Sequence, residues 1–242
     1  MKKILAASIF LFIFSLQGPS YAGGPFAVDV INDSGVALRW KNDMMDWHLD
    51  PGKVSPNVEN SIGKGWVDEA LDVWNDVTIL NAEDDLVETS TFKSYYKGML
   101  SEDVTSQNSQ PYLSASSGVS SIIFDEDGDI TAGLLGESNR STVVGLSAPL
   151  LSDSSGLYIT KGFALFNGYV LEAGDLAKSS DVAENLFKAT ILHEIGHMIN
   201  LDHSQVNDSI AQQCGDTGTL YTRDGDCGEE GEYIPTMYPE LL

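Results

Sequence analysis

The sequence predicts an α+β fold, because helix-like and strand-like patterns both recur along its 242 residues. Two long helices are expected, over residues 59–77 and 182–199. In the first, apolar side chains recur at helical spacing, at Ile62, Trp66, Ala70, Val73 and Trp74. The second contains no Pro, and Asp181 and Glu184 at its start have capping-box spacing. Short runs of β-branched and aromatic residues predict strands at residues 121–124, 143–146, 157–160 and 164–166.

The region from residue 83 to residue 118 is harder to assign. Residues 101–117 are rich in Ser, Gln and Asn, which predicts a long surface loop. No internal repeat is found. The length of the chain is sufficient for one well-cored domain with a smaller lobe.

Residues 193–203 read HEIGHMINLDH and contain three of the four histidines of the chain. On a helix, His193 and His197 are four residues apart on one face, so both imidazoles can bind the same metal ion. Glu194 lies at the edge of that face, where it can hold a water molecule without binding the metal. His203 can join this site only if the chain turns near residue 200.

Asn200 is the residue expected to make this turn. After Gly, Asn is among the residues that most readily adopt the left-handed conformation at the C-terminus of a helix. We therefore predict a positive φ at position 200. On this ground, Gly would serve equally well there, whereas a β-branched residue would be strained.

Residues that follow the motif resemble a known family. Ser204 comes directly after His203, and residues 235–239 read PTMYP. Together with the motif, they are similar to the matrixin branch of the metzincin metallopeptidases. Residues 36–40 and 59–77 resemble the opening strand and first helix of that family. The resemblance implies a zincin-like catalytic domain over residues 23–242, with a twisted, mostly parallel five-stranded sheet, long helices and a small C-terminal lobe beginning near residue 200.

The resemblance also implies a zinc-dependent endopeptidase. One zinc ion would be bound by His193, His197 and His203, and Glu194 would be the general base that acts on a metal-activated water. Met237 would form a hydrophobic floor beneath the zinc without binding it.

Two further groups of residues would contact an extended peptide or protein substrate. In the family, such a substrate pairs with a strand at the upper rim of the cleft, a form of β-augmentation. Here that strand would comprise Val143, Val144, Gly145, Leu146, Ser147 and Ala148. The pocket for the residue after the cleaved bond would be walled by Pro239 and Leu241.

Several departures from the matrixin pattern leave a second function open. Asn200 replaces the usual Gly, residues 204–236 form an insertion, and only His48 remains outside the motif, too few histidines for the family's second zinc. The chain ends at Leu242, without the helix that follows Met237 in the family. The alternative is a secreted, non-catalytic binding or adhesion module with a structural zinc site. Glu194 argues against it, because a purely structural site does not need that carboxylate.

The N-terminus predicts secretion, to the extracellular space or a periplasm. Lys2 and Lys3 precede an apolar run over residues 4–16, and residues 20–22 are suited to cleavage, so residues 1–22 are expected to be a signal peptide. Nothing later in the sequence is long and apolar enough for a membrane anchor. The formal net charge of -23 disfavours binding to nucleic acid and to anionic membranes. We expect a monomer.

Cysteines and acidic runs allow two further expectations. Cys214 and Cys227 are the two cysteines of the chain, and in an oxidising compartment a disulfide between them is the simplest reading, with two free thiols as the alternative. Calcium is possible at residues 125–129 and 224–232, although the Gly in the first run is misplaced for an EF-hand. Solubility is the other explanation for the acidic composition.

Overall fold

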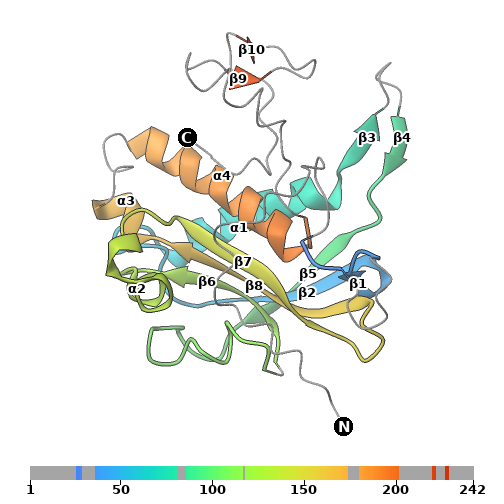
Figure 1. The fold of residues 1–242 in the computed structure, drawn as a ribbon. Helices are drawn as coiled ribbons and strands as arrows, with labels where there is room; N and C mark the ends of the chain where they lie inside the picture. The colour runs from blue at the N-terminus through green and yellow to red at the C-terminus, as the bar shows by residue number, and fades with distance from the viewer. Residues whose placement is uncertain are drawn as a thin grey trace.

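The computed structural model describes residues 26–28, 36–80, 86–116, 118–173, 180–201, 220–221 and 227–228. The helices in these ranges are η1 (Lys41–Asp43), α1 (Asn60–Asn75), α2 (Asp129–Leu135), η2 (Glu137–Asn139), α3 (Tyr169–Ala173) and α4 (Ser180–Met198). The strands are β1 (Arg39–Trp40), β2 (Met44–Leu49), β3 (Thr78–Leu80), β4 (Leu86–Thr89), β5 (Lys93–Met99), β6 (Ser120–Asp125), β7 (Gly145–Ser152), β8 (Tyr158–Asn167), β9 (Leu220–Tyr221) and β10 (Cys227–Gly228). Figure 1 shows α1 and α4 together over one face of a twisted sheet.

The main sheet has six strands in the order β1-β8-β6-β2-β5, and β7 pairs with β8 from the other side. Pairing is parallel throughout except between β7 and β8, which confirms the prediction of a mostly parallel sheet. The sheet has six strands where five were predicted. The difference arises because η1 interrupts the opening strand, with positive φ at Asn42 and Asp43. As a result β1 pairs with β8, whereas β2 continues beside β6 and β5.

Two hydrophobic clusters lie on opposite faces of this sheet. The larger includes Trp66 of α1, Phe166 of β8 and Phe187 of α4. The smaller joins Ile123 of β6 to Ile130 of α2 and to residues 100–113. Because both faces are covered, β6 is buried along its whole length, as expected for a central strand of a parallel sheet.

The loop at residues 101–119 is anchored by two buried charged side chains. The Asp50 carboxylate accepts hydrogen bonds from the backbone N–H groups of Gly52, Val104 and Phe124, and its burial raises its pKa to about 6. From β8, the Lys161 ammonium donates to the carbonyl oxygens of Pro111, Ser114 and Ser116. The loop was predicted to be a surface segment, but Val104 and Leu113 within it are buried.

Both long helices are confirmed, with one correction at a helix start. Helix α1 spans Asn60–Asn75, close to the predicted 59–77. Helix α4 begins at Ser180, so Asp181 lies inside the helix rather than at its N-cap. The strands predicted at 157–160 and 164–166 are parts of one strand, β8. Strands β2 and β5 were not predicted.

Candidate metal site on helix α4

Helix α4 is buried on more than one side, and each side carries a different kind of residue. Phe187, Ile191, Ile195 and Met198 recur at helical spacing and face the larger hydrophobic cluster. His193 and His197 lie on another face of the same helix, and Glu194 lies between the two sets. Contacts with β7, β8 and α1 hold the helix from several directions. The packing therefore fixes the direction in which the two imidazoles project.

His193 and His197 are arranged as a pair of metal ligands would be. Both are buried, and their ring centroids lie 4.8 Å apart with the planes at 88°. Nδ1 of His197 lies 2.8 Å from the carbonyl oxygen of Leu201. Metal-binding histidines commonly donate one ring N–H to a carbonyl, which fixes the tautomer and the ring orientation. The contact assigns Nδ1 to the backbone, so Nε2 of His197 is the candidate ligand atom.

Glu194 is held against strand β7 by Ser147. The Ser147 hydroxyl lies 2.8 Å from Oε2 of Glu194 and 2.5 Å from its backbone oxygen, and both residues are buried. Burial raises the pKa of the Glu194 carboxyl to about 7, while the hydrogen bond from Ser147 acts in the opposite direction. A carboxyl group that titrates near neutral pH can both accept and return a proton.

The predicted rim residues occupy the start of β7 and the turn before it. Gly145, Leu146, Ser147 and Ala148 belong to β7, whereas Val143 and Val144 precede it. Asn167 of β8 holds this turn: its side-chain amide donates to the Val143 carbonyl and its backbone N–H donates to the Val144 carbonyl. Among the described strands, β7 pairs only with β8, so its other edge can accept an extended chain.

Asn200, just after the end of α4 at Met198, has the conformation that the sequence predicts. The φ of Asn200 is 84°, which confirms the expected left-handed turn. The Asn200 N–H donates to the His197 carbonyl, and the Leu201 N–H donates to the Gly196 carbonyl, which together form a Schellman motif. The turn is therefore defined by backbone hydrogen bonds and by the residue at position 200.

The side chain of Asn200 corrects the expectation that Gly would serve equally well there. Asn200 is 3% exposed, and its amide makes hydrogen bonds with the backbone of Ala27 and Leu38. A glycine would keep the turn but lose these bonds. These bonds could not be predicted from the sequence, because the partners are more than 160 residues away along the chain.

The remaining predicted site residues lie outside the described part of the chain. They are His203, Cys214, Met237, Pro239 and Leu241. Of Cys227, only the backbone is described, in β10, so the disulfide stays a prediction. Within the described ranges, no three His, Cys, Asp or Glu side chains are grouped to hold a metal ion. The two described histidines fit two of the three expected zinc ligands.

Carboxylates of the first acidic run, residues 125–129, make contacts within the protein. Asp125 is buried, and its carboxylate accepts hydrogen bonds from the N–H groups of Ile130 and Thr131 and from the Thr131 hydroxyl. Asp129 pairs with Arg140. These contacts explain why acidic residues precede α2, because carboxylates near a helix N-terminus satisfy its first N–H groups. Calcium binding stays an untested prediction here.

Comparison with known proteins identifies the family. The family model for matrixins matches residues 39–220, which is most of the chain and includes β1, α1, the main sheet and α4. The chain therefore belongs to the matrixin family, and it is a zinc-dependent metalloprotease of that family. No curated protein and no solved structure matches it significantly. Within the described residues, no helix is long and apolar enough to cross a membrane.

Gly145→Ala is expected to disturb Glu194 without removing a ligand. A Cβ atom at position 145 would lie 2.6 Å from Cγ of Glu194 and 3.0 Å from Cγ2 of Thr190, so Glu194 must move. We expect kcat to fall at least about 10-fold with zinc content unchanged, because small misplacements of catalytic groups are costly. Gly133→Ala in α2, where a Cβ has open space, is the control. Equal kcat in the two variants would contradict this contact.

Asn200→Val should damage both folding and metal binding. A β-branched residue at a φ of 84° carries roughly 1–3 kcal/mol of backbone strain, and Val cannot replace the hydrogen bonds of the amide. We expect a lower melting temperature and weaker zinc binding, measured by calorimetry and by chelator competition. Stability and affinity equal to the wild type would show that the left-handed turn does not support the site.

Proposed function

We propose that this protein is a secreted zinc endopeptidase in which Glu194 is the general base. The observation that supports this most strongly is the position of Glu194. Its carboxylate is buried between the helix that carries His193 and His197 and the strand β7, and Ser147 holds it there. A structural zinc site has no need for such a carboxylate, whereas hydrolysis needs a base beside the metal.

Each site residue would have a separate role in peptide-bond hydrolysis. His193, His197 and His203 would hold a single zinc ion through three imidazole nitrogens. Bound zinc supplies Lewis acidity, which makes a water molecule more acidic and polarises the scissile carbonyl. Glu194 would take the proton of the attacking water and pass it to the leaving amine. A backbone N–H of β7 would stabilise the oxyanion.

Substrate binding would use the edge of β7. An extended peptide can add to this edge by main-chain hydrogen bonds, which are independent of sequence, and side-chain pockets would then provide selectivity. Pro239 and Leu241 would wall the pocket for the residue after the cleaved bond, and Met237 would form the hydrophobic floor beneath the zinc. Binding along an open edge suits cleavage inside a chain rather than at its ends.

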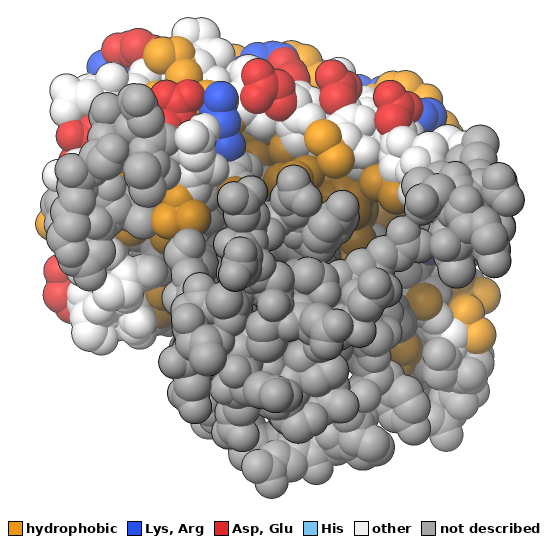
Figure 2. Space-filling view, turned by 90° about the horizontal axis from the view of Figure 1, so that it is seen from above, with side chains coloured by type: hydrophobic (Ala, Val, Ile, Leu, Met, Phe, Trp, Pro, Cys, Tyr) orange, Lys and Arg blue, Asp and Glu red, His pale blue; other side chains and the backbone are white. Residues whose placement is uncertain are grey.

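The proposal also includes the setting in which the enzyme works. A signal peptide over residues 1–22 would direct it out of the cytoplasm, where a Cys214–Cys227 disulfide could form. We propose a monomer in which residues 23–242 form one catalytic domain. Figure 2 shows acidic side chains in a row along one edge of the described surface, in keeping with the net charge of -23 and with solubility outside the cell.

The competing function is a binding or adhesion module in which zinc is only structural. Both functions require zinc, so zinc binding alone does not separate them. A structural site would be closed by four protein ligands, whereas a catalytic site keeps one position for water. The burial of Glu194 beside the two histidines favours the second arrangement.

Metal removal and reconstitution test the proposed function. The purified mature protein should contain one zinc per chain and cleave an unfolded protein substrate. A chelator should abolish cleavage, and zinc added to the dialysed protein should restore it. Cleavage that persists after complete metal removal would refute a zinc enzyme, and zinc binding without any cleavage would support the binding module.

A further inference from the structure

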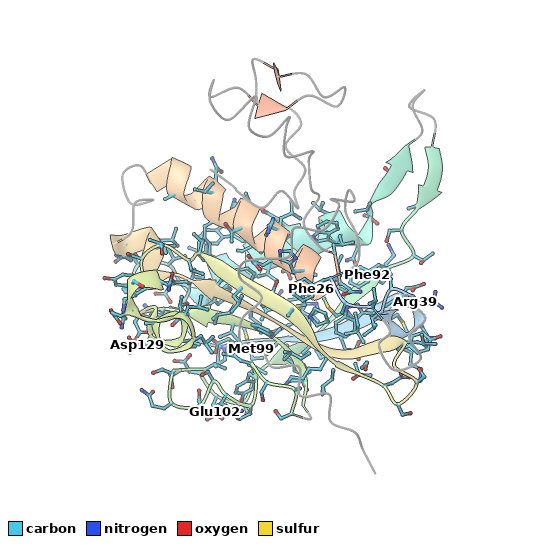
Figure 3. The ribbon with its side chains drawn as sticks, viewed as in Figure 1. Phe26, Arg39, Phe92, Met99, Glu102 and Asp129 are labelled. Atoms are coloured by element: carbon cyan, nitrogen blue, oxygen red, sulfur yellow. The ribbon has the colours of Figure 1, made fainter. Side chains whose placement is uncertain are left out.

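The end of α4 is joined to the N-terminal segment of the chain. This segment, Phe26–Val28, lies beside the residues that lead into β1: the Leu38 N–H donates to the Ala27 carbonyl, and Val28 forms an antiparallel bridge with Ala37. Figure 3 shows Phe26 next to the C-terminal end of α4. The first described residues of the protein are thus neighbours of the helix that carries His193 and His197.

Asn200 makes most of the polar contacts at this junction. Its Oδ1 accepts a hydrogen bond from the Ala27 N–H at 2.7 Å, and its Nδ2 donates to the Ala27 carbonyl at 2.9 Å and to the Leu38 carbonyl at 2.7 Å. Its backbone carbonyl accepts from the Phe26 N–H at 3.0 Å. Both hydrogens of the amide are used, so the Asn200 side chain pairs with Ala27 much as a neighbouring strand would.

Two contacts link the same junction to His197, one of the proposed zinc ligands. The ring of Phe26 lies 5.7 Å from the ring of His197, centroid to centroid. Nδ1 of His197 contacts the carbonyl of Leu201, the residue directly after Asn200. The orientation of His197 therefore depends on the position of residues 200–201, and Asn200 ties that position to Ala27 and Leu38.

Apolar burial alone would hold the segment weakly. Phe26 is 48% exposed and Val28 is 38% exposed, so little hydrophobic surface is removed from water. The hydrogen bonds to Asn200 are the principal described link between the segment and the helix. Glycine would permit the same φ at position 200 but could not make the three side-chain bonds.

We infer that Asn200 is a positioning residue that couples the N-terminal segment of the mature protein to the zinc site. The inference extends the proposed zinc enzyme and rests on it for the role of His197. Cleavage after Ala22 would place the new N-terminus only a few residues before Phe26. Removal of residues 23–28 would then loosen the same side of the site as loss of the Asn200 amide.

The coupling is tested with two variants and their combination. Asn200→Gly keeps the turn and removes the amide, and a protein that begins at Asp29 removes Ala27, its partner in the N-terminal segment, without altering α4 or Leu38. Asn42→Gly is the matched control, because Asn42 is an exposed Asn that also has a positive φ, at 55°. Hydrogen exchange is measured on the metal-free proteins, so this part is independent of zinc and of activity.

In metal-free Asn200→Gly, we expect the backbone amide of residue 27 to exchange about tenfold faster or more, because the bond that it donates to Oδ1 of Asn200 is lost. The amide of residue 38 donates to the Ala27 carbonyl, so it should also exchange faster as the segment loosens. The control should match the wild type. Zinc affinity, measured by chelator competition, should fall about 3- to 30-fold in either single variant. The visible spectrum of the cobalt-substituted protein should change in both, since it reports the ligand geometry.

The combined variant distinguishes coupling from two separate effects. If Asn200 acts through the N-terminal segment, the combined variant should lose no more zinc affinity than the stronger single variant. Additive losses, or unchanged exchange at residues 27 and 38 in Asn200→Gly, would overturn the inference.

If Asn200→Gly fails to fold, wild-type zinc affinity and an unchanged cobalt spectrum in the truncated protein would also overturn it. A wild type that binds no zinc refutes the proposed function instead, and the exchange result still decides whether Asn200 holds the segment.

Discussion

Glu194→Ala is expected to lower kcat by about two to four orders of magnitude while zinc stays bound. The change removes the proposed general base, and general acid–base catalysis contributes rate factors of that size. All three proposed ligands remain, and the Ser147 hydroxyl can still donate to the backbone oxygen of residue 194. The measurement is kcat and KM on a fluorogenic peptide, together with the zinc content of the same sample.

The matched control for this variant is Glu184→Ala. Glu184 is an exposed carboxylate on the same helix, where it pairs with Lys188. Its removal should change kcat less than about twofold, because surface substitutions away from a site have small effects. Turnover by Glu194→Ala at the wild-type rate would refute the mechanism. Loss of zinc from Glu194→Ala would show that the carboxylate supports the metal site rather than the chemistry.

His203→Ala is expected to weaken zinc binding more than about 100-fold. Loss of a hydrogen-bonding partner of a ligand already costs about 10- to 100-fold in affinity, so loss of a ligand should cost more. Only His193 and His197 on α4 would then remain. Affinity is measured by competition with a chromogenic chelator, and full zinc occupancy of the variant at low free zinc would contradict the three-histidine site.

His48→Ala is the control for the histidine substitution. His48 lies in β2 and is the one histidine outside the motif. Its removal should leave zinc affinity unchanged. Equal losses in the two variants would mean that the effect of His203→Ala comes from general destabilisation rather than from a missing ligand.

Features that depend on local sequence could be predicted. Helix α1 follows from the spacing of apolar residues, which is a property of neighbouring turns, and α4 follows from a long run without Pro. The shared face of His193 and His197 follows from helix geometry, and the positive φ of Asn200 follows from the conformational preference of Asn. Each of these inferences uses residues that lie within a few positions of one another.

Strands β2 and β5 show where such reasoning was incomplete. In β2, buried Met45, Trp47 and Leu49 alternate with residues that are more exposed, a period of two that is present in the sequence but covers only six residues. In β5 no such alternation exists: Tyr95 and Tyr96 are adjacent and both are exposed. An edge strand of this kind is defined by its pairing with β2 rather than by its own pattern.

The contacts that refine the site could not be predicted from one sequence. Ser147 and Glu194 are separated by 47 residues, and Asn200 and Ala27 by 173. Both pairs meet only because the sheet places β7 and the N-terminal segment beside α4. Motif spacing predicts which residues can bind a metal, whereas tertiary packing decides which side chains orient them.

The most direct test of the central claim is cleavage-site profiling on a peptide library with the purified mature protein. The wild type, the chelator-treated wild type and Glu194→Ala are compared in parallel. We predict cleavage at internal bonds by the untreated wild type alone, with recovery when zinc is returned to the treated sample. Absence of internal cleavage by the zinc-loaded wild type, or equal cleavage by Glu194→Ala, would contradict the account.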